Sequence, residues 1–223
     1  MSNIFNIFDP STSIMSMKMN WISSIMVIMI MTTSYWMMNS RYKMIINLPT
    51  KIMNYEFNLL MSKKNKGTMM LFIALLYLIT MNNFMGLFPY LFTSTSHLTM
   101  TMTLSLPLWM SFMIFGWMKN TKNMFIHLVP LGTPSLLMPF MVCIETISNM
   151  IRPITLAVRL TANMIAGHLL LTLLGNTTMS MMNLILPMMI LIQIMLLLLE
   201  TAVAIIQGYV FSVLSILYAE EVN

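Results

Sequence analysis

The sequence predicts an all-α integral membrane protein with about five membrane-crossing helices and one interfacial amphipathic helix. Of its 223 residues 58% are hydrophobic and 8% are charged, whereas soluble domains carry about 25% charged residues. The apolar runs are long and continuous, unlike the alternating segments of about ten residues that build transmembrane barrels. The basic residues gather beside these runs. We therefore expect a single membrane domain over residues 1–223.

Five predicted spans follow one another along the chain. Each is apolar over at least the length of about 20 helical residues that a bilayer core requires. Polar or aromatic residues flank them, as the membrane interface favours. The spans are residues 14–38, 69–88, 97–117, 134–174 and 183–218. We expect Gly175 and Asn176 to end the fourth of them.

Residues 44–62 have a different pattern, which predicts an interfacial helix. Apolar residues recur every three or four positions, and asparagine and lysine occupy the opposite side. A helix with one apolar and one polar face lies in the membrane surface. The alternative is a helix packed on other protein. The apolar stripe is Ile45, Leu48, Ile52, Tyr55 and Leu59.

The basic residues predict an orientation. Eight of them lie in the first and third connections, and none lies in the second or fourth. Because basic loops stay on the side of synthesis, these two connections face one compartment together with the C-terminus. The net charge of +5 is thus read as a topology signal, and no nucleic-acid partner is expected.

Methionine is unusually frequent, with 32 residues spread over every segment. Methionine replaces other apolar residues readily, so this frequency indicates codon bias in an organelle genome. No Arg-rich targeting segment precedes the first span. We expect an organelle-encoded protein of the mitochondrial inner membrane, with its N-terminus in the intermembrane space and its C-terminus in the matrix.

The last two helices are longer than a bilayer is thick. About 36 helical residues extend over roughly 54 Å, whereas the hydrocarbon core is about 30 Å thick. We therefore expect both helices, 134–174 and 183–218, to tilt strongly and to pair as an antiparallel hairpin.

The penultimate helix carries four ionisable residues, although each charge at mid-membrane costs about 2.5–3.5 kcal/mol. Glu145, Arg152 and Arg159 are seven residues apart, so they share one helical face. His168 falls on the opposite face. Such residues mark ion paths, proton relays or buried counter-ions.

An antiparallel hairpin pairs these residues with polar residues of the last helix. In an antiparallel pair of helices, the residue numbers of two facing residues add up to a nearly constant value. This rule places Arg159 opposite Gln207 and His168 opposite Glu200. Glu145 then falls near Glu220 and Glu221. The hypothesis is three polar levels: acidic, Arg–Gln and His–Glu.

Each group has a functional and a purely structural interpretation. Arg159 keeps its charge, which suits a proton barrier and a carboxylate attractor; the alternative is an arginine paired with Glu145 or with carbonyl groups. His168 and Glu200 can titrate in a useful range, or they form one hydrogen-bonded pair. The sequence leaves the role of Arg152 open.

Two sequences carry a resemblance to a known family. ETISNMIRPITLAVRLTANMIAGHLL and LLETAVAIIQGYVFSVL closely resemble subunit a of mitochondrial F-type ATP synthases. The resemblance implies a stator that presents two aqueous half-channels to a rotating ring of c subunits. The implied partners are that ring, other stator subunits, lipid and protons. No cofactor or metal is expected in this chain, and ATP chemistry is expected on other subunits.

The resemblance also implies residue roles. Arg159 matches the essential arginine that acts on the ring carboxylate, with Asn163 and Gln207 beside it. His168 and Glu200 match the pair of the inlet channel. Glu145 matches an acid of the exit channel, whereas Arg152 matches no motif position.

Two other functions remain open from the residues. A self-contained proton-coupled transporter needs internal repeats and a midplane site, and no repeat is visible. A structural subunit of a respiratory complex predicts scattered polar residues instead of an ordered stripe.

Overall fold

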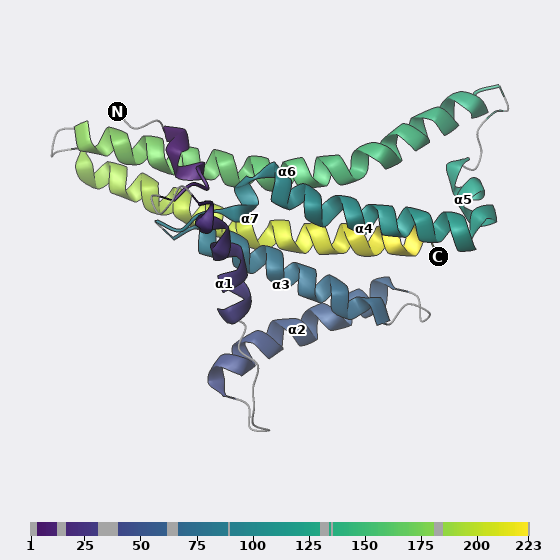
Figure 1. Cartoon of the computed structure of the whole chain (residues 1–223), viewed down its shortest axis with the longest axis horizontal. Coiled ribbons are helices and arrows are strands. Elements are labelled where there is room, and N and C mark those ends of the chain that lie inside the picture. Colours follow the sequence, from purple (N-terminus) through teal and green to yellow (C-terminus); the bar gives the residue numbers. More distant parts are fainter. Residues whose placement is uncertain are drawn as a thin grey trace.

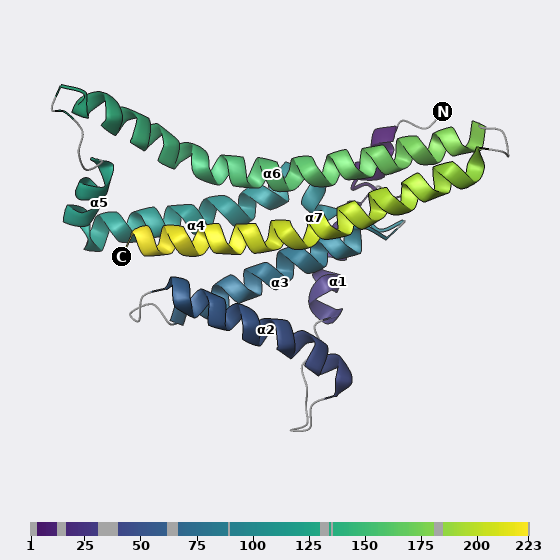
Figure 2. The ribbon, with the colours of Figure 1, turned by 180° about the vertical axis from the view of Figure 1, so that it is seen from behind.

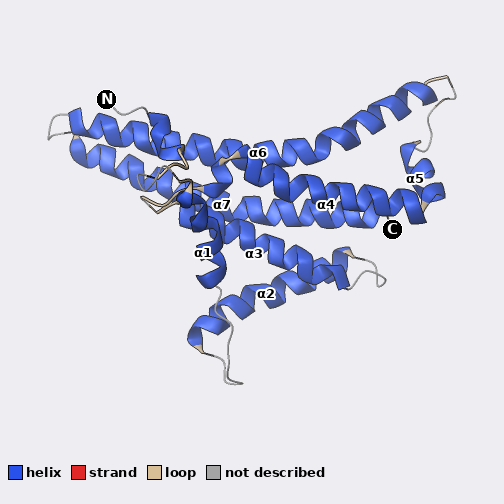
Figure 3. Ribbon diagram, viewed as in Figure 1, coloured by secondary structure: helices blue, strands red, loops and turns tan. Residues whose placement is uncertain are grey.

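Among the described residues of the computed structural model, helices dominate and no strand is found (Figure 3), which confirms the predicted all-α fold. The structure describes residues 4–12, 17–30, 40–61, 67–88, 90–129, 134, 136–180 and 185–222. Four of the described helices are long and apolar enough to cross a membrane. They are α3 (Met69–Gly86), α4 (Leu98–Lys119), α6 (Met138–Ser180) and α7 (Leu186–Glu221).

The first predicted span contains helix α1, which covers Ile22–Ile30 and follows a 3-10 turn, η2, at Met19–Trp21. Helix α1 thus lies within the predicted 14–38, although it begins later than residue 14. Before it, Thr12 donates both its N–H and its hydroxyl to the carbonyl of Met17, at 2.9 and 2.7 Å. Residues 31–38 lie outside the described residues.

Helix α2 (Arg41–Leu60) begins at a serine cap, where the Ser40 hydroxyl accepts a hydrogen bond from the Lys43 N–H at 3.3 Å. One face of α2 packs on α3 through the buried Phe57. The side chains of its apolar stripe are exposed, and the interfacial position of this helix stays a prediction. The stripe residues are Ile45, Leu48, Ile52, Tyr55 and Leu59.

The core lies along α7, which packs between α3 and α6 (Figure 1). One buried cluster joins α2, α3 and α7 through Phe57, Phe72 and Ile216. A second cluster joins α3, α6 and α7 through Ile79, Leu160 and Phe211. Because the second cluster includes Leu160, it fixes the rotation of α6 beside Arg159.

Helices α6 and α7 form an antiparallel hairpin. The C-terminal part of α6 and the N-terminal part of α7 lie side by side, and the two helices then diverge (Figure 2). Helix α4 packs on both where they separate, and the short α5 (Thr121–Leu128) follows it. The predicted tilt relative to the bilayer remains a prediction.

The bounds of α6 differ from the predicted 134–174. The helix begins at Met138 because the chain turns before it, with the Leu137 N–H donating to Pro134 at 3.0 Å. Gly175 was expected to end the helix, yet α6 continues to Ser180. A helical glycine costs only about 1 kcal/mol, and Thr178 donates its hydroxyl to the Gly175 carbonyl at 2.6 Å.

Helix α7 also shifts relative to the predicted 183–218. It begins at Leu186, with Pro187 in the first turn where a missing N–H costs nothing. It ends at Glu221. The longer C-terminal end adds the carboxylates of Glu220 and Glu221 to the helix, and that of Glu221 contacts Arg152 of α6.

Candidate functional site

Helix α6 has a buried face and an open face at its middle. Ala157, Leu160 and Met164 are at most 5% exposed and follow helical spacing. Arg159 and Asn163 lie on the other side and are exposed. The packing of Leu160 therefore holds Arg159 outward, on a surface that the chain itself leaves uncovered.

Arg159 lines a cavity of about 310 Å³ between α6 and α7. Asn163 and Gln207 are the other polar residues of this cavity, whose remaining walls are leucine, isoleucine, valine and phenylalanine. Both side-chain amide atoms of Gln207 are buried without a hydrogen-bond partner among the described residues. A fixed positive charge thus lies beside unused hydrogen-bonding groups in apolar surroundings, where electrostatic interactions are strong.

His168 and Glu200 lie at the next level of the hairpin, where Glu200 of α7 faces Gly167 of α6. Glu200 is 8% exposed and reaches across to α6, where it contacts the backbone of Gly167. Within the described part of the chain, His168 Nε2 and both carboxylate oxygens of Glu200 have no hydrogen-bond partner. Because each unpaired buried polar group costs about 1–3 kcal/mol, this level is suited to water or protons from outside the chain. The alternative of one satisfied His–Glu hydrogen bond is wrong.

A cavity of about 870 Å³ leads to His168, and we call it the N-terminal cavity. Its walls are residues near the N-terminus, residues 86–88 and 90–93 at the end of α3 and just after it, and residues of α6 and α7. The backbone N–H of Ser11 donates to Asp9 at 3.0 Å and holds the pKa of that carboxyl below its usual value. The cavity therefore carries a negative charge at neutral pH. Its polar lining includes Asn6, Asp9, Ser11, Thr12, Asn20, His168 and Thr172.

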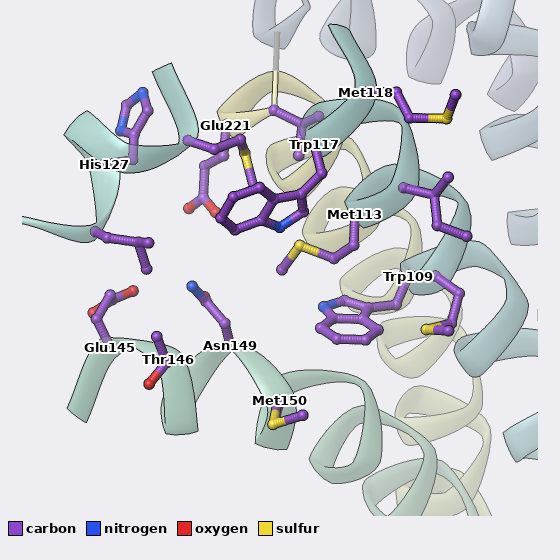
Figure 4. Close-up of a pocket in the computed structure, with 15 residues that line it drawn as sticks. Trp109, Met113, Trp117, Met118, His127, Glu145, Thr146, Asn149, Met150 and Glu221 are labelled. Carbon is purple, nitrogen blue, oxygen red and sulfur yellow. The ribbon is translucent and has the colours of Figure 1, made fainter. Parts of the chain in front are cut away.

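A second cavity of about 670 Å³ lies where α6 and α7 diverge, and we call it the tryptophan cavity. In Figure 4, Glu145 and Asn149 of α6 lie on one side and Trp109 and Trp117 of α4 on the other. Glu221 approaches from the end of α7. The tryptophan cavity thus combines apolar walls with two carboxylates.

Arg152 joins the two carboxylates of this cavity. Its guanidinium lies 3.2 Å from Glu145 and 3.1 Å from Glu221, and 5.5 Å from the centre of the Tyr218 ring. The seven-residue spacing from Glu145 was visible in the sequence. The pairing with Glu221 was not, because it depends on where α7 ends. Arg152, and not Arg159, is therefore the partner of Glu145.

The structure brings the predicted residues together in three places along the hairpin. Arg159, Asn163 and Gln207 share one cavity. Glu200 contacts α6 beside His168. Glu145 lies with Glu221 at the far end. Sequence reasoning did not single out Gly167, although a glycine next to a membrane histidine is a signal of close helix approach.

Comparison with known proteins decides the family. The family model described as "ATP synthase A chain" matches residues 14–220. The chain is 57% identical over 225 residues to ATP synthase subunit a of Aedes aegypti and 58% identical over 225 residues to that of Anopheles gambiae. It is 57% identical over 224 residues to the Drosophila melanogaster protein, and each alignment covers 100% of both chains.

The chain belongs to the ATP synthase subunit a family. It is accordingly a proton-translocating subunit of the ATP synthase membrane sector, a component and not a catalytic subunit. The apolar helices and the insect relatives make it a multi-pass protein of the mitochondrial inner membrane. This assignment favours the first of the three functions considered from the sequence.

Proposed function

We propose that this chain forms two aqueous half-channels against a rotating ring of c subunits, and that Arg159 acts on the ring carboxylate between them. The observation that carries the proposal is the position of Arg159. It lies on an open face of α6, in a cavity of its own. Among the described residues, none lines both the N-terminal cavity and the tryptophan cavity.

The N-terminal cavity is proposed as the inlet from the intermembrane space, with His168 and Glu200 passing the proton inward. The tryptophan cavity is proposed as the outlet to the matrix, with Glu145 as its acid. This assignment follows the orientation from the basic connections, which puts the N-terminus in the intermembrane space. Because the guanidinium of Arg159 stays protonated, it prevents direct proton passage between the cavities and attracts the ionised ring carboxylate.

The free energy comes from the membrane potential, about 2.3 kcal/mol per proton for each 100 mV. A proton that enters by the inlet cannot reach the outlet past Arg159. It must bind the ring carboxylate and travel with the ring before release. Rotation of the ring, and contact with the other ATP synthase subunits, then connects proton flow to ATP synthesis elsewhere in the complex.

The ring contact can be tested by cross-linking. Ala162→Cys lies on the open face of α6, and it should cross-link on oxidation to a cysteine placed one turn from the ring carboxylate. The background is Cys143→Ser, because Cys143 is exposed. Met70→Cys on α3, where the native side chain is 75% exposed, is the control and should give no cross-link. Equal cross-linking at both positions would contradict the proposed interface.

Arg152 gives a test of the outlet. Arg152→Met leaves Glu145 and Glu221 without the cation between them, and like charges then repel. We expect proton-driven ATP synthesis to fall a few-fold, because the partly exposed ion pairs contribute only about 1 kcal/mol or less. Adding Glu221→Gln should restore part of the rate. A double-mutant cycle measures this coupling, and strictly additive losses would show that the cluster does not act as a unit.

A further inference from the structure

The N-terminal segment, residues 4–12, packs against the functional hairpin, although it lies more than 150 positions from His168 in the sequence. Its 3-10 helix η1 (Ile4–Phe8) contacts α6 (Figure 1). Asn6, Asp9 and Ser11 of this segment line the N-terminal cavity opposite His168 and Thr172. The segment is therefore one wall of the cavity that leads to His168.

Phe8 is the residue of this segment that contacts His168. The two rings are 6.4 Å apart between centroids, at an interplanar angle of 77°. This is the edge-to-face arrangement that aromatic rings favour. Glu200 approaches α6 from α7 at Gly167, the residue before His168. The Phe8 ring is thus the aromatic neighbour of the imidazole at the level where Glu200 reaches α6.

The backbone of Phe8 is fixed by a second histidine. The ring nitrogen Nε2 of His97 lies 2.9 Å from the Phe8 carbonyl and donates to it. The His97 ring stacks on Phe92 at 5.1 Å and lies tilted by 42° against Trp21 at 5.4 Å, both between ring centroids. These contacts connect the N-terminal segment to the starts of α1 and α4. His97 therefore anchors Phe8 without touching His168 itself.

Two further contacts hold the segment to residues just before α1. Asn20 donates its side-chain N–H to the Asp9 carbonyl at 3.3 Å, and Thr12 donates its hydroxyl to the Met17 carbonyl at 2.7 Å. The wall is thus fixed to the described part of the fold at both Asp9 and Thr12.

We propose that residues 4–12 form a wall of the inlet and that Phe8 is a positioning residue for His168. The Phe8 ring covers the imidazole on one side, so water and protons reach His168 through the polar side of the cavity. It also keeps the imidazole turned toward Glu200. This inference rests on the proposed inlet role of the N-terminal cavity, but the shielding of the cavity by Phe8 can be measured separately from proton flow.

The charged and titratable groups around His168 come from several elements. None of the described lysines or arginines lines the N-terminal cavity. A change in how the ATP synthesis rate depends on the pH at the inlet side therefore reports on a small set of groups. They are Glu200 on α7, Asp9 and Tyr90 in the cavity wall, and His97 behind Phe8.

The test compares Phe8→Ala with Phe5→Ala in the assembled ATP synthase. Phe5 belongs to the same 3-10 helix but is 69% exposed, so Phe5→Ala is the matched control. We expect Phe8→Ala to slow proton-driven ATP synthesis roughly 3- to 10-fold, because small displacements of a reacting group have effects of this order or larger. The dependence of the ATP synthesis rate on the intermembrane-space pH should change, and its dependence on the matrix pH should not. Phe8→Tyr, which keeps the ring, should restore the original dependence.

A second readout does not depend on proton flow. A Thr172→Cys reporter, in the Cys143→Ser background, lies in the N-terminal cavity. A membrane-impermeant thiol reagent should label it several-fold faster in Phe8→Ala and in His97→Ala than in the parent or in Phe5→Ala. Unchanged labelling together with an unchanged pH dependence would overturn the proposal. Faster labelling with normal synthesis would contradict the positioning role of Phe8, and a change in both pH dependences would contradict its restriction to the inlet.

Failure of the proposed function would look different. If protons do not pass this cavity, His168→Ala would leave the synthesis rate and its dependence on intermembrane-space pH unchanged. Slow synthesis in His168→Ala together with normal synthesis in Phe8→Ala would instead contradict only the positioning role of Phe8. The two proposals can therefore fail independently.

Discussion

Arg159→Ala should reduce proton-driven ATP synthesis to background while the complex still assembles. The guanidinium is exposed on the open face of α6 and forms no ion pair within the described part of the chain. Its loss therefore leaves the packing of Leu160 and the hairpin unchanged. Without the permanent charge, nothing releases the proton from the ring carboxylate. The measurement is the rate of ATP synthesis in sealed membranes, with assembly checked on native gels.

Passive proton leak separates the two roles of Arg159. If the charge is also the barrier between the half-channels, the leak through Arg159→Ala complexes should rise. Arg159→Lys is the matched control, because a desolvated lysine can lose its proton, and it should show an intermediate leak. Synthesis at the parent rate in Arg159→Ala would contradict the function proposed for this residue.

Gly167→Ala should lower proton-driven synthesis roughly 10- to 100-fold, the range expected when a reacting group is misplaced by about 1 Å. A methyl group at this position would lie 2.9 Å from Cδ of Glu200 and even closer to Oε1. A flexible glutamate can swing away, so the fold should survive. The carboxylate, however, would leave its position beside His168.

Gly175→Ala is the matched control for this prediction. It lies in the same helix, and its added methyl group would be 3.9 Å from Gln193, an ordinary contact. Both substitutions raise the helix propensity by about 1 kcal/mol. Activity should therefore fall only for Gly167→Ala. Equal loss in both variants would mean that the glycines act through helix flexibility and not through Glu200.

The hairpin could be predicted from the sequence because its signals are local. The long apolar helices, the seven-residue spacing of Glu145, Arg152 and Arg159, and the antiparallel register need no information from the rest of the chain. The register placed Gln207 at the level of Arg159, where both line one cavity. What these residues do in the assembled complex stays a prediction.

Other features depended on contacts between distant parts of the chain. The contact of Phe8 with His168 joins residues 160 positions apart in the sequence, and no periodicity predicts it. The role of Arg152 required the exact end of α7, because Glu221 lies three residues beyond the predicted terminus at 218. Gly175 was read as a helix end, although tertiary contacts often override such a local preference.

Side-specific labelling tests the central claim of two separate half-channels most directly. Thr172→Cys lies in the N-terminal cavity and Asn149→Cys in the tryptophan cavity. In sealed membranes and the Cys143→Ser background, a membrane-impermeant thiol reagent should label Thr172→Cys only from the intermembrane-space side. It should label Asn149→Cys only from the matrix side. Labelling of both cysteines from the same side, or of either from both sides, would contradict the two half-channels.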